Sequence, residues 1–213
     1  KLLNESSGKE IGANEKGVVA VVPPLPPGCM TTVWGQDERF VQTYFTSFKD
    51  QLIYTTFDWG IRDDDGYYFI LGRTDDVINV AGHRLGTREI EEAVSGHPNI
   101  AEVAVVGVHD AIKGQVPVAF AVVKDAGKLT DAEGRRALEK EVLAVVDKAL
   151  GAIGRPARVH FVTLLPKTRS GKVLRRSIQA IVEGRDPGDL TTLDDPAGIE
   201  QIRAAVDGKS GSV

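Results

Sequence analysis

The hydrophobic pattern of the chain changes near residue 74, and this change limits the folds that the sequence can adopt. Before it, β-branched and aromatic runs at 17–22, 51–57 and 67–71 alternate with Pro-, Gly- and Asp-rich segments, which is typical of strands joined by turns. The Asp-Asp-Asp-Gly sequence at 63–66 predicts a hairpin turn because its glycine can adopt a positive φ. The first 74 residues are therefore predicted to form an all-β subdomain without a helix.

After residue 74, helical periodicity alternates with apolar strands. Helices are expected over 87–95, 131–150 and 173–181, and strands over 100–108, 116–123 and 159–163. Thr87 is expected to cap the first helix, a capping box from Thr130 to Glu133 begins the second, and Gly151 ends it. Pro117 demotes its strand toward a sheet edge, or places its missing N–H away from a partner.

This order of elements predicts an α+β protein, with a small β subdomain followed by an α+β domain. The segment 184–213 is rich in Asp, Gly and Pro, and we expect it to be a tail on the surface with a short helix at 199–206. The boundaries expected are therefore 1–74, 75–183 and 184–213.

Composition narrows the class of protein. The chain has 213 residues, 42% of them hydrophobic, and a net charge of -4, which is typical of a globular protein. It contains no run of about 18 apolar residues that would span a membrane, and its first residues do not resemble a signal peptide. Cys29 is the only cysteine, so no intrachain disulfide can form, and a cytoplasmic location is expected. The chain begins without Met, within apparent strand material, which suggests a piece of a longer protein.

Basic residues gather in one part of the chain. From Arg155 to Arg185 there are eight Lys and Arg residues against one acid, Glu183. Such a segment can form a local face that meets phosphates, or it can be an ordinary solvated helix face. An anion- or nucleic-acid-binding module without chemistry therefore stays open as an alternative function.

A Gly-Lys pair lies in the loop 166–172, before a predicted helix. Backbone N–H groups and a lysine in such a place can cradle phosphate. The segment is not a Walker loop, because Pro166 occupies the position of the first glycine and Val173 that of the Ser or Thr. What is left is a flexible loop that presents the ammonium of Lys172 at its tip, or an ordinary basic start of a helix.

The segment 72–86 spans the predicted boundary between the two parts. Its charged residues suit a hinge, since they stay solvated in more than one domain orientation. Its glycines, Gly82 and Gly86, would allow the backbone to approach a ligand closely. The plainer interpretation is a turn with a surface ion pair that joins an aspartate at 75 or 76 to Arg73 or Arg84.

Taken together, the segments 72–84 and 166–172 resemble the paired motifs of the adenylate-forming enzymes, in order, in spacing and in relation to the domain boundary. Further likeness at 56–62, 82–90 and 184–190 is to the short-chain acyl-CoA synthetases, in their propionate branch. The resemblance implies that 1–74 ends a large adenylation domain, that 75–183 is a mobile C-terminal domain, and that the ATP loop and the acyl pocket lie N-terminal to Lys1.

The resemblance also implies a role for six residues. It assigns Lys172 to catalysis of adenylation, Asp58, Arg73 and Arg84 to binding the nucleotide, Gly82 to the passage for the pantetheine arm of CoA, and Asp75 to the hinge. Asp58 would bind the ribose hydroxyls. The preceding residue departs from the family, which usually has Gly where this chain has Phe57.

The implied reaction uses ATP, Mg²⁺ and coenzyme A to convert a short-chain carboxylate, propionate in preference to acetate, into its CoA thioester. The partners implied are the chain's own N-terminal adenylation domain and an acetyltransferase and a deacetylase that act on Lys172; no nucleic-acid or membrane partner is expected. The fragment alone would be inactive. A C-terminal domain that serves a carrier-protein-linked adenylating enzyme is a further alternative.

The other conspicuous residues predict packing roles. The four histidines, at 83, 97, 109 and 160, lack the spacing of metal ligands, so no metal site is expected. Trp34 and Trp59 are expected to anchor a core. Cys29 is expected to be a packed thiol, because no basic activator is near it in the sequence.

Overall fold

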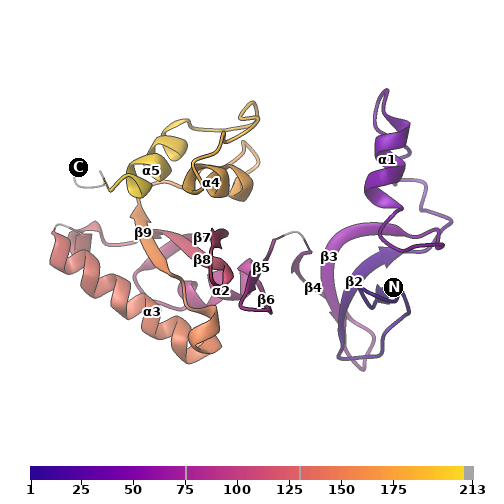
Figure 1. Cartoon of the computed structure of the whole chain (residues 1–213), viewed down its shortest axis with the longest axis horizontal. Coiled ribbons are helices and arrows are strands. Elements are labelled where there is room, and N and C mark those ends of the chain that lie inside the picture. Colours follow the sequence, from indigo (N-terminus) through magenta and orange to yellow (C-terminus); the bar gives the residue numbers. More distant parts are fainter. Residues whose placement is uncertain (75, 130, 209–213) are drawn as a thin grey trace. The chain divides into compact units, whose positions relative to one another are not determined.

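The computed structural model describes residues 1–74, 76–129 and 131–208 (Figure 1). It divides into two compact units, Lys1–Asp75 and Asp76–Val213. The α+β class predicted from the sequence is confirmed, and each unit is described by itself below. No helix in the described residues is both long enough and apolar enough to cross a membrane.

The first unit is built on a four-stranded antiparallel sheet in the order β1-β2-β3-β4. Its strands are β1 Leu2–Leu3, β2 Lys16–Val21, β3 Tyr54–Arg62 and β4 Tyr68–Arg73. The predicted hairpin joins β3 to β4, where Gly66 has a φ of 88°. A small core forms from Leu3, Val18, Ala20, Phe48 and Ile53, and Trp59 packs against it.

Helix α1, Asp37–Tyr44, shows that the prediction of a helix-free first unit was wrong. Asp37 and Glu38 lie in its first turn, where acidic side chains complement the helix dipole. Phe40 and Tyr44 are one turn apart and their rings contact at 5.4 Å. The helix has only eight residues and no side-chain cap, so its hydrophobic periodicity is too short to be recognised in the sequence. Trp34, expected in a core, is 97% exposed.

The second unit contains a five-stranded sheet in the order β6-β5-β8-β7, with β9 also paired to β8. Its strands are β5 Val77–Val80, β6 His83–Gly86, β7 Ile100–Asp110, β8 Gly114–Val123 and β9 Arg158–Val162. Strand β9 pairs parallel with β8, and the other pairs are antiparallel. The short strands β5 and β6 lie within the segment 72–86 and were not predicted.

Strand β8 lies inside the sheet, so the edge interpretation of Pro117 was wrong. The backbone of Pro117 faces β9, because its carbonyl accepts a hydrogen bond from Ala157 N at 2.8 Å. The ladder to β9 starts one residue later, at the pair Val118 and Arg158. The absence of an N–H at Pro117 therefore removes no hydrogen bond of the ladder, which agrees with the other interpretation given for this proline.

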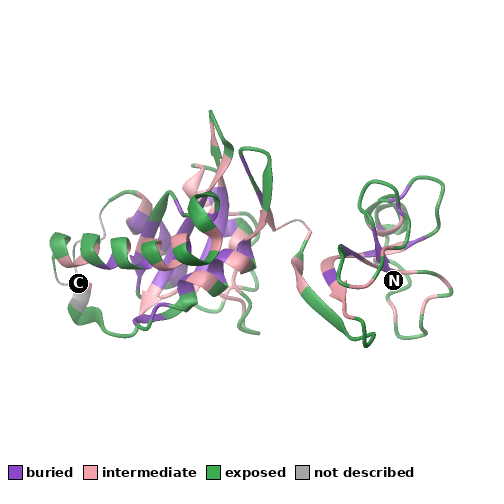
Figure 2. Cartoon of the chain, turned by 90° about the horizontal axis from the view of Figure 1, so that it is seen from below, coloured by how far each residue is buried: buried purple, intermediate pink, exposed green. Residues whose placement is uncertain are grey.

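Helices cover both faces of this sheet, as α3 on one side and α4 with α5 on the other show in Figure 1. The helices are α2 Thr87–Ser95, the 3₁₀ helix η1 Ala126–Leu129, α3 Ala132–Gly154, α4 Arg175–Val182 and α5 Ala197–Val206. Neighbouring residues of β7 point to opposite faces: Val105 packs in the cluster of α2 and α3, and Ala104 and Val106 pack in that of α4 and α5. Both faces of the sheet are therefore buried (Figure 2).

Helix ends differ from the predicted ones in detail. Gly86, and not Thr87, is the N-cap of α2. Asp131 caps α3 by accepting a hydrogen bond from Gly134 N at 2.7 Å, and Thr130 lies outside the described residues. Gly151 does not end α3 but kinks it, with a φ of 70°.

Helix α5 corrects the expectation of a tail that only lies on the surface. Ile199 is 3% exposed and Ile202 is fully buried, and the two lie about one helical turn apart. Ile202 belongs to the same cluster as Phe120 of β8 and Ile178 of α4. Burial of these side chains makes α5 part of the core of the second unit.

Candidate functional site

The six residues predicted to form the site are divided between the two units. Asp58 and Arg73 lie in the first unit, and Gly82, Arg84 and Lys172 lie in the second. Asp75, the predicted hinge, lies outside the described residues. The two groups are described separately, beginning with the first unit.

Asp58 and Arg73 are cross-strand partners on β3 and β4. The Nη1 atom of Arg73 lies 3.9 Å from Oδ1 of Asp58 and donates a hydrogen bond to the carbonyl of Thr56 at 3.2 Å. The side chain of Asp58 is 30% exposed and that of Arg73 is 45% exposed. A carboxylate and a guanidinium are thus presented together at the surface, with lone pairs of the carboxylate left for a ligand.

Phe57 occupies the left-handed region, with a φ of 62°. A side chain is disfavoured there, which accounts for the glycine that the family usually has at this position. The ring of Phe57 lies 5.9 Å from that of Tyr44 and 5.6 Å from the guanidinium of Arg73. Its carbonyl accepts a hydrogen bond from Thr74 N at 2.8 Å. These contacts hold the strained backbone just before Asp58.

Gly82 lies in the tight turn of the β5–β6 hairpin. Val80 and His83 pair across the turn, and both central residues have a positive φ, 48° for Ala81 and 85° for Gly82. This is the backbone of a type I′ turn, which prefers glycine at its second central position. A Cβ atom on Gly82 would meet nothing within 4 Å, so the glycine leaves open space at the tip. Arg84 is exposed on β6, opposite Asn79.

Lys172 lies in a hydrogen-bonded hairpin, and not in the flexible loop that was expected. Lys167 pairs with Val173 across it. Thr168 N donates to the carbonyl of Lys172 at 2.8 Å, and Lys172 N donates to Oγ1 of Thr168 at 3.1 Å. Gly171, with a φ of 80°, closes the turn by donating to Thr168 O at 2.8 Å. The side chain of Lys172 is exposed.

Half of the eight cations in the basic segment 155–185 form ion pairs. Four of its cations have acidic partners: Arg155 with Asp147 at 3.4 Å, Lys167 with Glu102 at 2.7 Å, Arg175 with Glu91 at 2.7 Å, and Arg185 with Glu183. Lys172, by contrast, forms no ion pair within the described residues. The segment is therefore not a uniform basic face, and Lys172 is one of its cations without an ion pair in the described residues.

The pair of Glu91 and Arg175 connects α2 to α4 and was not found in the sequence. Arg175 donates from Nε at 2.9 Å and from Nη2 at 2.7 Å, and Glu91 also accepts from Val105 N at 2.9 Å. The hydrogen bonds to Glu91 raise the pKa of Arg175 above its ordinary value. The sequence signal was an acid beside Ile90 and Val94 on the apolar face of a predicted helix.

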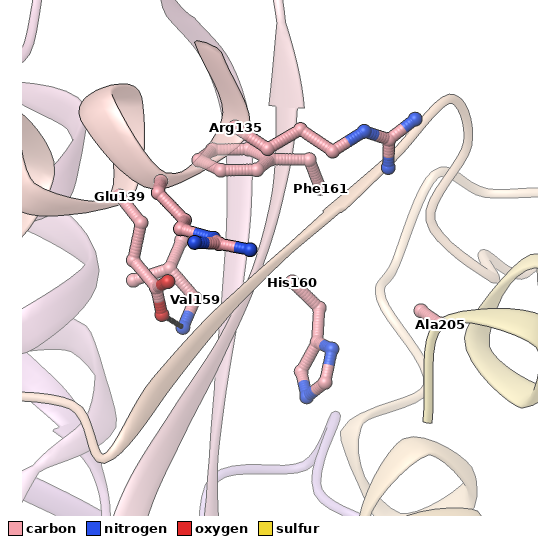
Figure 3. A pocket seen from close by; sticks show the side chains of 7 residues that line it. Arg135, Glu139, Val159, His160, Phe161 and Ala205 are labelled. Carbon is pink, nitrogen blue, oxygen red and sulfur yellow. Dashed lines mark hydrogen bonds between the residues drawn. The ribbon is translucent and has the colours of Figure 1, made fainter. Parts of the chain in front are cut away.

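A pocket of about 130 Å³ in the second unit is lined by none of the predicted site residues (Figure 3). It is lined by Arg135, Arg136 and Glu139 of α3, Val159, His160 and Phe161 of β9, and Ala205 of α5. Glu139 accepts a hydrogen bond from Val159 N at 3.0 Å, and the ring of His160 stacks on Phe120 at 5.0 Å. Burial, together with the charge of Arg158, lowers the pKa of His160. These groups are engaged in structural contacts.

Residues 1–74, 76–129 and 131–208 contain no cluster of side chains suited to binding a metal ion. No group of three or more His, Cys, Asp or Glu side chains there could hold a metal ion.

Comparison with known proteins gives a consistent family. Residues 89–172 match the AMP-binding enzyme C-terminal domain. The chain is 63% identical over 207 residues to the propionate–CoA ligase of Salmonella typhimurium and 64% identical to that of Escherichia coli, covering 97% of this chain and 33% of each relative. It is 44% identical to an acetyl-coenzyme A synthetase of Pyrobaculum arsenaticum, over 94% of this chain and 29% of that protein.

A solved structure agrees with these relatives. ATP-bound MatB from Rhodopseudomonas palustris has a TM-score of 0.69 and 29% identity, and the match covers 84% of this chain and 34% of MatB. The chain thus spans about a third of the length of the proteins that it matches. The motifs, the fold and the sequence identity agree, and the chain belongs to the AMP-binding enzyme family and contains the C-terminal domain of that family.

Proposed function

We propose that the chain is the C-terminal portion of an ATP-dependent acid–CoA ligase. Such an enzyme joins a carboxylate to AMP, releasing pyrophosphate, and then transfers the acyl group to the thiol of CoA, releasing AMP. Propionate is the favoured acid, because identity to the propionate–CoA ligases is 63–64% but identity to the acetyl-coenzyme A synthetase is 44%. Acetate is the runner-up substrate.

Lys172 carries the first half-reaction in this proposal. The carboxylate and the α-phosphate are both anions, and negative charge builds on the oxygens between them as they approach. A positioned ammonium lowers the barrier by stabilising that charge. The observation that supports this role is the exposure of Lys172 at a hydrogen-bonded hairpin without an ion pair in the described residues, whereas Lys167 and Arg175 in the same segment are paired.

Asp58 and Arg73 suit the nucleotide in chemical terms. A carboxylate can accept two hydrogen bonds from the neighbouring hydroxyls of a ribose, and the exposed guanidinium beside it can meet a phosphate oxygen. Arg84 would meet phosphate from the second unit. Mg²⁺, when bound with ATP, would offset phosphate charge; since the described residues offer no ligand cluster, we assign it no ligand here.

The second half-reaction requires a different face of the second unit. We propose that this unit rotates about Asp75, withdrawing Lys172 and presenting the β5–β6 hairpin to CoA. The division of the chain at Asp75 and Asp76 supports this. The open space around Gly82 suits the thin pantetheine arm, because any side chain would project from the tip of the turn.

The first unit would continue into a larger adenylation domain. Strand β4 is an edge strand, and Tyr68, Phe69 and Ile70 along it are 49%, 52% and 50% exposed. Adjacent residues of a strand point to opposite faces, so apolar side chains are exposed on both faces of β4. Natural edge strands are rarely left in this condition, which supports a covering domain.

The direct test uses a chimaera in which these 213 residues replace the matching third of the Salmonella typhimurium propionate–CoA ligase. We expect the chimaera to form propionyl-CoA, with propionate used in preference to acetate. Lys172→Ala should abolish propionate-dependent exchange of pyrophosphate into ATP but spare thioester formation from supplied propionyl-adenylate. Lys113→Ala, another exposed lysine of the same unit, should leave both unchanged. Equal loss of both half-reactions in Lys172→Ala would refute the assignment.

Two further expectations complete the proposal. The 213-residue chain by itself should form no propionyl-CoA, since the relatives are about three times as long. Acetylation of Lys172 should remove the charge on which adenylation depends, and a deacetylase should restore that charge. Intact-mass spectrometry and adenylation assays on the same samples would measure both effects. Formation of propionyl-CoA by the isolated chain would contradict the first expectation. An unchanged rate of adenylation after acetylation of Lys172 would contradict the second.

The alternative functions have less support. The ion pairs in the segment 155–185 remove much of the charge that a nucleic-acid-binding module would use. Binding to nucleic acid with a steep salt dependence would favour that module. Transfer of the acyl group to a carrier-protein thiol in preference to CoA would identify a carrier-linked enzyme.

A further inference from the structure

The segment 190–194, which we name the tail strand, runs along the hairpin that bears Lys172. Thr168 and Leu193 form a β-bridge. Arg169 N donates to Thr192 O at 3.1 Å, and Asp194 N donates to Lys167 O at 2.9 Å. This segment therefore adds one β-bridge and two flanking backbone hydrogen bonds to the hairpin, from a point about 20 residues further along the chain.

The base of the hairpin is held at two further places. Gly198, in the first turn of α5, packs so closely on Pro166 that a Cβ atom would lie 2.8 Å from Pro166 Cα. Lys167 donates to Glu102 of β7 at 2.8 Å. Because α5 is anchored in the core by Ile202, the tail strand connects the hairpin to a rigid part of the unit.

The hairpin needs such support. A two-stranded hairpin alone is marginally stable in water, so the hydrogen bonds from the tail strand should help to hold it. Lys172 contributes a single charge at the end of a long stem, so its backbone must be fixed for the charge to be delivered to one place. A misplacement of about 1 Å can slow a reaction by about 100-fold.

We infer that the tail strand is a positioning element for Lys172 in the adenylation half-reaction. It contacts neither substrate in this role but fixes the backbone from which the ammonium projects. The inference rests on the proposed function of Lys172 and adds to it a segment to which the resemblance gave no role in the reaction.

The variant Asp194→Pro tests the inference with little other disturbance. Asp194 is exposed, and proline removes the N–H that donates to Lys167 O. A residue before proline prefers extended backbone, which suits Leu193 in its bridge. Asp194→Ala is the matched control, because it removes the carboxylate but keeps the N–H.

The structural readout is hydrogen exchange in the 213-residue chain. Asp194→Pro should lower the protection of the amides of Arg169 and Lys172 by about tenfold or more and leave the amides of β7 and β8 unchanged. Asp194→Ala should match the parent. Unchanged protection in the hairpin would overturn the inference.

The functional readout is the pair of half-reactions in the chimaera described above. Asp194→Pro should slow adenylation about tenfold or more and leave thioester formation from supplied propionyl-adenylate within about twofold. In a Lys172→Ala background it should leave thioester formation from supplied propionyl-adenylate within about twofold, since the tail strand acts through Lys172. Equal loss of both half-reactions, or a further loss in that background, would show a general effect on folding and overturn the inference.

A second variant, Gly198→Ala, approaches the same hairpin from its base. The new methyl group must displace Pro166, so adenylation should again fall more than thioester formation. If Lys172→Ala leaves adenylation intact, the proposed function fails; if Lys172→Ala abolishes adenylation but neither tail variant slows it, only the inference about the tail fails.

Discussion

Replacing Arg175 by methionine should destabilise the second unit by an amount that can be worked from its contacts. Glu91, whose side chain is 12% exposed, accepts three hydrogen bonds, and two of them come from Arg175. Arg175→Met removes those two and leaves the carboxylate with Val105 N alone. A buried charge that loses its partner is the main source of the expected destabilisation.

The magnitude is below that of a fully buried pair. Breaking such a pair costs about 3–5 kcal/mol, but the side chain of Arg175 is 30% exposed, so water can reach and screen part of the interaction. We therefore expect a loss of about 2–3 kcal/mol in the free energy of unfolding. At about 3 °C per kcal/mol for a unit of this size, the melting temperature should fall by roughly 6–9 °C.

The two units can be followed separately in one sample. Both tryptophans, Trp34 and Trp59, lie in the first unit, whereas helices α2 to α5 lie in the second. Far-UV circular dichroism should therefore report the shift in Arg175→Met, and the tryptophan fluorescence transition should stay in place as an internal control.

A double variant tests the reasoning about charge. Glu91→Gln added to Arg175→Met leaves a neutral side chain that can still accept from Val105 N, so about 1 kcal/mol or more of the lost stability should return. If Arg175→Met alone changes the melting temperature by less than about 2 °C, or if the double variant is less stable than the single one, the ion pair does not act as described.

Three more predictions concern other parts of the chain. Burial lowers the pKa of His160 from its ordinary 6.5. The contribution of His160 to stability is therefore complete above pH 6.5 and falls as the pH drops from 6.5 toward the lower pKa of the folded state. His160→Gln should flatten the fall in melting temperature between about pH 7 and 5. Phe57→Ala should destabilise the first unit more than Phe57→Gly, by about 1 kcal/mol in fluorescence-detected urea unfolding, because only glycine relieves the positive φ; the opposite order would argue against strain. Ile202→Ala, at a fully buried position, should cost about 2–4 kcal/mol in unfolding followed by circular dichroism, and a cost below about 1 kcal/mol would argue against its place in the core.

The parts of the fold that were predicted correctly have local signals. The long strands β7 and β8 are predominantly apolar, and α3 shows apolar residues at helical spacing after an acidic cap. Such patterns depend on neighbouring residues only. The parallel pairing of β9 with β8 is a long-range choice, and no local pattern in β9 indicates its partner.

The missed elements are short or have a composition that suggests a loop. Strands β5 and β6 have four residues each and lie in a segment rich in charge and glycine. Ala81 adopts a positive φ of 48°, which its residue type does not indicate. A short helix at 199–206 was expected and α5 is present, but the Asp- and Gly-rich sequence before it favoured a surface tail, so the burial of Ile199 and Ile202 was not predicted.

The candidate site divides in the same way. Motif resemblance predicts roles for Lys172, Gly82 and Asp58, because each of them lies in a short segment of characteristic sequence. The sequence did not indicate that Lys172 lies in a paired hairpin, since the partner strand is formed by Leu193 and its neighbours, which follow no motif. Nor did it indicate that Phe57 would hold the left-handed backbone that glycine usually supplies.

The parallel pairing of β9 couples one end of the sheet to α3. Parallel strands need a long crossover between them, and here the crossover contains the whole of α3. Val159 and Phe161 of β9 belong to the same buried cluster as Leu138, Val142 and Val146 of α3. A substitution that loosens α3 should therefore also weaken the pairing of β9 with β8.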